Sequence, residues 1–187
     1  RSNYLFRSNT VIGDFMSGSV GDNTARASGV IASAGGGGKV LQVVQTVKTD
    51  TNTVASASMV DLGISTDITP TSSSSKILAI ASLNIGGVTG GRGGVNIVRD
   101  STDILLADTA SNRIRATKME FAPNSACSYS INITYLDSPS TTSATTYKIQ
   151  GSMEGGNTLT INRTYTDTDS STWYRGTSTL TLMEIGA

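Results

Sequence analysis

The sequence predicts an all-β protein: a jelly-roll-like sandwich of about ten short antiparallel strands that follows an extended N-terminal arm. Ser and Thr together fill 53 of the 187 positions, and Phe and Trp together only four. Branching at Cβ, as in Thr, Val and Ile, suits a pleated strand better than a helix. The apolar residues, 37% of the chain, recur in alternating runs and show no helical period.

The strands are predicted from short apolar runs that are separated by turn-forming residues. Residues 39–48 form the first, in which Val, Leu and Gln alternate. The other predicted strands are 53–59, 62–68, 76–85, 94–99, 104–107, 113–121, 128–136, 145–153, 158–163 and 178–185. Stretches rich in Ser, Gly, Pro and Asp are expected to form loops at 69–75, 86–94, 137–139 and 154–157.

The strand at 76–85 is apolar on both faces. Ile77, Ala79 and Leu83 alternate on one face, and Leu78 and Ile80 lie on the other. Burial of both faces in a domain of this size predicts a central strand or a contact between subunits. The strand at 178–185 repeats this pattern and is expected to lie in the core or against a symmetry mate.

Residues 1–38 are predicted to form an N-terminal arm with a Gly-rich hinge, and residues 39–187 the head domain. A few large apolar side chains lie among Ser, Asn and Gly in the arm, and Gly35–Gly38 ends it. Such a segment has too little apolar surface for a core of its own, so it either docks on a neighbouring subunit or other partner protein, or stays mobile. Because residue 1 is Arg, we expect a processed chain or a fragment.

Composition excludes several function classes. The 14 basic and 14 acidic side chains cancel, so the chain lacks the basic surface that nucleic acid requires. The absence of His excludes imidazole-based catalysis and the common zinc sites, and the single Cys127 forms no disulfide within the chain. No apolar run is long enough to insert into a membrane. We expect no enzyme activity, no cofactor and no resident metal.

From Gly37 onward the chain resembles a domain found at the C-terminal ends of tail-fibre and virion structural proteins of tailed phages, especially marine ones. The resemblance rests on an ordered string of phrases that covers about 150 residues. These phrases are GKVLQVV at 38–44, KTDT at 48–51, ITP at 68–70 with SSSSKI at 72–77, LDSP at 136–139, TTY at 145–147 and INRT at 161–164. The resemblance implies a trimeric all-β head attached to a virus particle, with a structural or host-contacting role and no catalytic residues.

One polar loop carries the candidate ligand-binding residues. The only tryptophan of the chain lies between two predicted strands, beside a tyrosine and an arginine. Sugar rings stack on aromatic faces, and their hydroxyls pair with carboxylates and guanidinium groups. A glycan patch is therefore predicted, with burial of the aromatic rings as a loop anchor or trimer contact as the alternative. The candidate residues are Tyr165, Asp167, Asp169, Trp173, Tyr174 and Arg175.

Other motifs are interpreted structurally. The Gly-rich stretches 35–39 and 86–94 lack the GK[ST] sequence of a phosphate loop, so 86–94 is expected to be a mobile loop. Residues 167–171 place oxygen ligands at alternate positions, but Gly and Glu are missing where an EF-hand needs them. Asp100, Asp103 and Asp108 are expected to be turn formers, with a carboxylate pair of a glycanase as the alternative.

The sequence thus predicts a non-enzymatic virion structural protein. We expect the head domain of a tail fibre or spike, which forms a homo-oligomer, above all a trimer, and binds a glycan or protein of the bacterial surface. The alternative within the structural class is a capsid decoration or tail component without receptor binding. A carboxylate-based glycanase is the alternative among enzymes.

Overall fold

The computed structural model describes residues 38–187, apart from the side chains of Glu120 and Phe121. The regular secondary structure of this part of the chain is β-strand, apart from one 3-10 turn, η1, at Glu154–Gly156. The predicted arm, except for Gly38, lies outside the described residues. The strands are β1 Val40–Lys48, β2 Asn52–Ala55, β3 Val60–Ile68, β4 Lys76–Gly87, β5 Gly91–Arg99, β6 Thr102–Ile104, β7 Lys118–Ala122, β8 Ser128–Asp137, β9 Thr145–Met153, β10 Thr158–Ile161 and β11 Ser178–Ile185.

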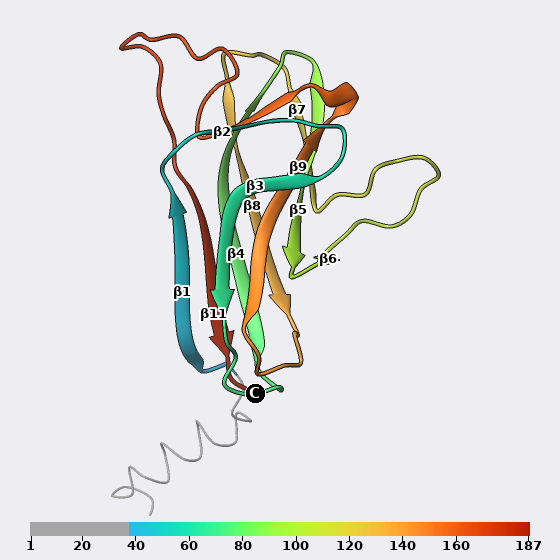
Figure 1. Cartoon of the computed structure of the whole chain (residues 1–187), viewed down its shortest axis with the longest axis vertical. Helices are drawn as coiled ribbons and strands as arrows, with labels where there is room; N and C mark the ends of the chain where they lie inside the picture. Colours follow the sequence, from blue (N-terminus) through green and yellow to red (C-terminus); the bar gives the residue numbers. More distant parts are fainter. Residues whose placement is uncertain (1–37) are drawn as a thin grey trace, which may run out of the picture. The chain divides into compact units, whose positions relative to one another are not determined.

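The strand pairing confirms the jelly roll. Four antiparallel pairs are nested along the chain: β1 with β11, β3 with β9, β4 with β8, and β5 with β7. Further pairing of β11 with β4 and of β9 with β5 joins them into two sheets. Sheet A contains β1, β11, β4 and β8, extended by β10 and β2, and sheet B contains β3, β9, β5, β7 and β6 (Figure 1). All the pairs are antiparallel, so the fold is the predicted two-sheet sandwich.

The core lies between the two sheets and is built from aliphatic side chains. Strand residues alternate between faces, so every second residue of β4, β8 and β11 points inward. Among the described side chains, Tyr147 is the one aromatic residue that is fully buried in this core, and the partly buried Tyr135 packs against it. The other large fully buried side chains are Leu62, Ile64, Ile77, Leu83, Ile85, Ile97, Ile133, Ile149, Met153, Leu159 and Ile161.

Two buried carboxylates link elements of the sandwich. Asp137, at the end of β8, accepts hydrogen bonds of 2.6 Å from the Tyr147 hydroxyl and from Arg99 Nη1 of sheet B. Glu184, on β11, accepts from Gln42 Nε2 at 2.6 Å and from the Thr71 hydroxyl and backbone N–H at 2.6 and 2.8 Å. These hydrogen bonds satisfy charged groups that burial would otherwise penalise.

The predicted loop at 86–94 is wrong, because the structure forms a tight hairpin there. β4 continues through Gly86 and Gly87, and β5 begins at Gly91. Glycine is needed in these strands for close packing: a Cβ on Gly86 would lie 2.6 Å from the Arg163 carbonyl oxygen, and one on Gly87 would lie 2.5 Å from Met153 Cε. These glycines therefore allow neighbouring groups to pack directly against the strand, and they do not form the mobile loop that was expected.

Several other predicted strands have different bounds. The strand predicted at 53–59 corresponds to β2, which ends at Ala55. Residues 113–117 belong to a loop, and β7 begins only at Lys118. Arg115 Nε donates to the Ala107 carbonyl at 2.6 Å, and the Thr117 N–H donates both to Asn96 Oδ1 at 3.1 Å and to the Val95 carbonyl at 3.0 Å, so side-chain contacts and a single backbone bond to β5 hold this segment. The strand predicted at 104–107 ends at Ile104, because Leu105 has a φ of 56°.

The two ends of the described domain lie together, far from the candidate loop. The Gly38 N–H donates to the Gly186 carbonyl at 3.0 Å, next to the β1–β11 pair. The loop of residues 162–177, between β10 and β11, lies at the opposite end of the sandwich (upper end of Figure 1). Among residues 38–187, no helix has the length and hydrophobicity that crossing a membrane requires.

Candidate functional site

The 162–177 loop is fixed at its base by Asn162. This buried residue has a φ of 62°, a conformation that Asn tolerates better than most side chains. Its Nδ2 donates to the carbonyls of Lys48 at 2.9 Å and Asp50 at 2.8 Å, and its Oδ1 accepts from the buried Ser178 hydroxyl at 2.7 Å. The first residue of the loop is thereby joined to the start of β11 and to the end of β1.

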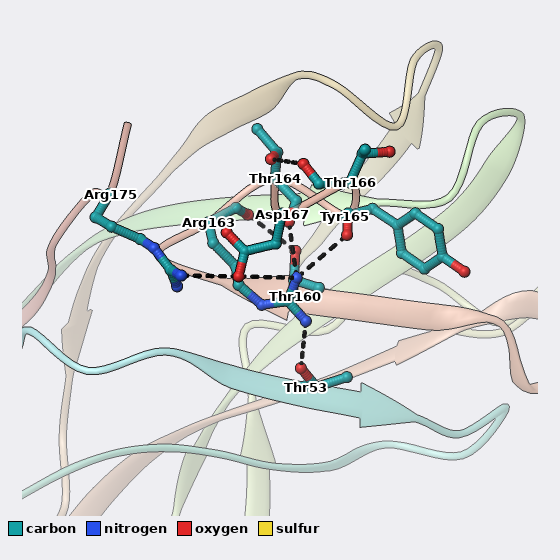
Figure 2. Close-up of polar contacts among 8 residues, drawn as sticks. All are labelled: Thr53, Thr160, Arg163, Thr164, Tyr165, Thr166, Asp167 and Arg175. Atoms are coloured by element: carbon teal, nitrogen blue, oxygen red, sulfur yellow. Dashed lines mark hydrogen bonds and ion pairs between the residues drawn. The ribbon is translucent and has the colours of Figure 1, made fainter. Parts of the chain in front are cut away.

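Arg163 organises the next turn. Its Nη1 donates to the carbonyls of Thr164 and Tyr165 at 3.1 and 3.2 Å, and its Nη2 donates to Thr53 Oγ1 on β2 at 2.8 Å (Figure 2). Its own carbonyl accepts from Thr160 Oγ1 at 2.9 Å. Arg163 is mostly buried. The loop is therefore supported from beneath by hydrogen bonds from this guanidinium group and not by packed apolar side chains.

Asp167 joins the two arms of the loop. Its carboxylate accepts a 2.8 Å hydrogen bond from Arg175 Nη2 and lies 3.8 Å from Arg163 Nη1 (Figure 2). The sequence predicted Asp167 and Arg175 as ligand contacts. They contact each other, eight residues apart, so part of their polar capacity is used to shape the loop.

Five of the six predicted residues surround one shallow concavity of about 280 Å³. Tyr174 is 84% exposed, and Trp173 is partly buried. The backbone N–H of Trp173 donates to the Ser170 carbonyl in a tight turn. The lining residues are Asp167, Thr168, Asp169, Ser170, Trp173, Tyr174 and Arg175. Two aromatic rings thus adjoin carboxylates, hydroxyls and a guanidinium, which is the chemistry that a sugar ring requires.

Tyr165 is the predicted residue that lies apart from this group. Its ring points away from Asp167 and Arg175 (Figure 2), and it does not line the concavity. The neighbouring Thr166 N–H donates to the Ser125 carbonyl at 2.9 Å, and this bond ties the segment to the β7–β8 connection. Tyr165 therefore belongs to the flank of the loop.

The alternative sites have structural explanations. Asp100, with a φ of 54°, accepts from the Thr146 N–H at 3.0 Å, and Asp103 accepts from Asn96 Nδ2 at 3.2 Å, so both hold turns around β5 and β6. Within residues 38–187, no group of three carboxylate or thiol side chains is arranged to hold a metal ion. The free Cys127 is exposed.

A second concavity was not foreseen. It measures about 510 Å³ and lies under the 105–117 loop, where its lining is mainly apolar. Ile114 is 64% exposed there, and Met59, Ala116 and Met119 complete the apolar part of the wall. Arg92 and Glu154 form an ion pair of 3.2 Å at its rim. Its described lining offers no aromatic face for stacking against a sugar ring.

The chain was compared with known proteins. No family model matches it, and no curated protein matches it. It is similar to the crystal structure of the infectious bursal disease virus VP2 subviral particle, with a TM-score of 0.34 and 13% identity over 78% of this chain and 39% of that one. For the structure of the Gx strain of the same virus, the TM-score is 0.33 and the identity 14%, over 78% and 40%. The chain spans less than half the length of these proteins.

Sequence reasoning missed Asn162 and Arg163, which carry the loop. Both lie in the strand predicted at 158–163. β10 ends at Ile161, one residue before the positive φ. An Asn directly after an alternating apolar run was the available signal, since Asn often occupies this conformation.

Proposed function

We propose that this chain is a non-enzymatic virion structural protein, the head domain of a tail fibre or spike, which oligomerises and binds a host-surface receptor through the 162–177 loop. The sequence resemblance to tail-fibre and virion structural proteins suggests the setting. The observation that carries the receptor role is the concavity beside Trp173 and Tyr174, whose loop is braced by Asn162 and Arg163. Because these contacts already hold the loop in one conformation, less conformational entropy is lost when a ligand binds.

The position of the loop supports this role. Gly38 and the C-terminus lie side by side at the other end of the sandwich. A head attached to the particle through that end would present the 162–177 loop outward. A glycan is the preferred ligand, because exposed tyrosine and partly exposed tryptophan next to Asp169 and Arg175 provide stacking and hydrogen bonding together. Several copies on each particle would convert weak contacts into strong attachment.

The test is binding of the fluorescently labelled full chain to a panel of bacterial strains. We expect binding to at least one strain. Trp173→Ala should abolish it, and Ile114→Ala, which alters the second concavity, should leave it unchanged. Both variants must retain the β-type circular dichroism spectrum of the wild type.

Three results would contradict the proposal. Full binding by the folded Trp173→Ala protein would remove the loop from receptor recognition. Loss of binding in Ile114→Ala alone would move recognition to the 105–117 loop. Absence of binding to any strain, together with incorporation into particles, would favour a capsid decoration or tail component.

A further inference from the structure

The outer face of sheet A, which points away from the core, is more apolar than a solvent-exposed sheet face usually is. The strand registers align its outward side chains in three rows across β1, β11, β4 and β8. The first row is Val43, Met183, Leu78 and Leu136. The second is Gln45, Thr181, Ile80 and Thr134, and the third is Val47, Thr179, Ser82 and Asn132.

These side chains face outward because their neighbours in each strand face the core. Leu182 and Ala79 are fully buried, whereas Val43 is 53% exposed and Leu136 is 46% exposed. The first row thus forms an unbroken apolar band across four strands. A contiguous apolar patch on a soluble protein marks an interaction site, whereas single exposed apolar residues do not.

The outer face of sheet B provides an internal comparison. There Asp61 and Asp67 on β3 face outward, and Lys148 on β9 lies 3.1 Å from Asp61. Gln150 and Thr146 complete hydrogen bonds to these carboxylates at 2.7 and 2.6 Å. The β3–β9 part of sheet B therefore has the charged surface of a face that remains in water, whereas its β5–β7 part carries the apolar concavity under the 105–117 loop.

None of the side chains in the three rows of sheet A is charged. Lys76, which pairs with Ile185, stands at the margin. A symmetric contact brings a surface against copies of itself, so charged groups near the axis would repel one another. Thr, Ser, Asn and Gln side chains both donate and accept, and can therefore pair with copies of themselves. Such a surface is suited to self-association.

The three rows set the size of the contact. Four strands spaced about 4.8 Å apart, crossed by three rows about 6.8 Å apart, cover roughly 19 Å by 20 Å. Each copy would bury roughly 400 Å² in flat projection, or about 800 Å² for two copies. Side-chain relief adds to this area, which places the contact at the small end of specific interfaces.

We propose that the outer face of sheet A is the surface through which copies of this chain pack against each other. The inference rests on the oligomerisation part of the proposed function and gives it a location, and it does not depend on receptor binding. Met183 lies at its centre, on β11 between β1 and β4. Leu136 lies on β8, at the far side of the band.

The test is the mass of the full chain in solution by light scattering, for which one chain is 19.3 kDa. We expect two or three chains for the wild type and one chain for Met183→Glu. Ser65→Glu, a matched charge on the outer face of sheet B opposite Lys148, should keep the wild-type mass. Leu136→Lys, at a more exposed site, provides a second variant if Met183→Glu does not fold.

A charge-swap experiment tests the symmetry of the contact. Met183→Lys should also be monomeric, and mixing it with Met183→Glu should restore association through opposite charges. A monomeric wild type, or variants at Met183 and Leu136 that keep the wild-type mass, would overturn the proposal. Binding to bacteria is measured separately, so a monomeric wild type that still binds would remove the interface and leave the receptor site.

Discussion

At the scale of single residues, Glu184 shows how this fold stabilises a buried carboxylate through hydrogen bonds from uncharged donors. Burial alone would raise the pKa of its carboxyl group, but hydrogen bonds from Thr71 and Gln42 outweigh it and lower the pKa to about 2 from an ordinary 4.5. The donors come from β1 and from the β3–β4 connection, so the ionised carboxylate ties three segments together. This stabilisation exists only while Glu184 is ionised.

The pH dependence of stability follows from this shift. Because the folded pKa is below the unfolded value, the contribution of Glu184 is complete above about pH 4.5 and is lost as the pH falls towards 2. Glu184→Gln should therefore have a lower melting temperature than the wild type at pH 7, and the difference should shrink as the pH approaches 2. A difference that stays constant across this range in thermal scans would contradict the assignment.

Tyr147 and Asp137 form the second buried polar contact. Burial and the hydrogen bond to the Asp137 carboxylate both raise the pKa of the Tyr147 hydroxyl, so it remains a donor throughout the ordinary pH range. Tyr147→Phe should reduce the free energy of unfolding by about 1–3 kcal/mol, because Asp137 then keeps only Arg99. Urea denaturation measures this, and an unchanged midpoint would show that the tyrosine hydroxyl contributes nothing.

At the scale of elements, the 162–177 loop should be only as rigid as its base. Asn162→Asp keeps the size of the side chain but removes the donor to the Lys48 and Asp50 carbonyls and adds a buried charge. A loss of about 1–3 kcal/mol should make opening of the loop about 5- to 150-fold more frequent. Trypsin cleavage after Arg175 should accelerate accordingly, with Ser171→Ala, on the exposed part of the same loop, as the unchanged control. Equal cleavage rates would contradict the bracing role.

Local patterns predicted most elements of the fold. The alternation in 39–48, 76–85, 145–153 and 178–185 located β1, β4, β9 and β11, because an inward and outward period of two is a local property of a strand. The hairpin at 86–94 and the loop at 113–117 were missed because they depend on distant partners. Gly86 faces Arg163, and Thr117 bonds to Asn96.

The candidate site could be predicted only in part, because its aromatic residues stand out in the local sequence but the support of the loop depends on residues outside that segment. Trp173 and Tyr174 were singled out because large aromatic residues are unusual in a polar segment. Their enclosure with Asp167 depends on Arg163, which was predicted to lie in a strand, and Tyr165 was included only because it is near in sequence. The residue types that suggest sugar binding can be read from a short segment of the sequence. The contacts that support the loop cannot, because they join it to other strands.

At the scale of the whole molecule, the jelly roll separates three surfaces in space. Sheet B presents charged side chains on β3 and β9, sheet A presents three uncharged rows on β1, β11, β4 and β8, and the 162–177 loop lies at the end opposite Gly38. An assembly through sheet A would keep the loops of all copies at the same end only if the copies were parallel, as around a threefold axis. The expected trimer satisfies this condition and remains a prediction.

The most direct test of the receptor role uses the intrinsic fluorescence of Trp173, the one tryptophan of the chain. Purified capsular polysaccharides and lipopolysaccharides from a panel of bacteria would be titrated into the full chain while emission is recorded. The account predicts a saturable shift in emission with at least one of them, and weaker or absent binding by Tyr174→Ala. Saturable binding of a polysaccharide, detected by calorimetry, with no change in Trp173 emission and no effect of Tyr174→Ala would contradict it.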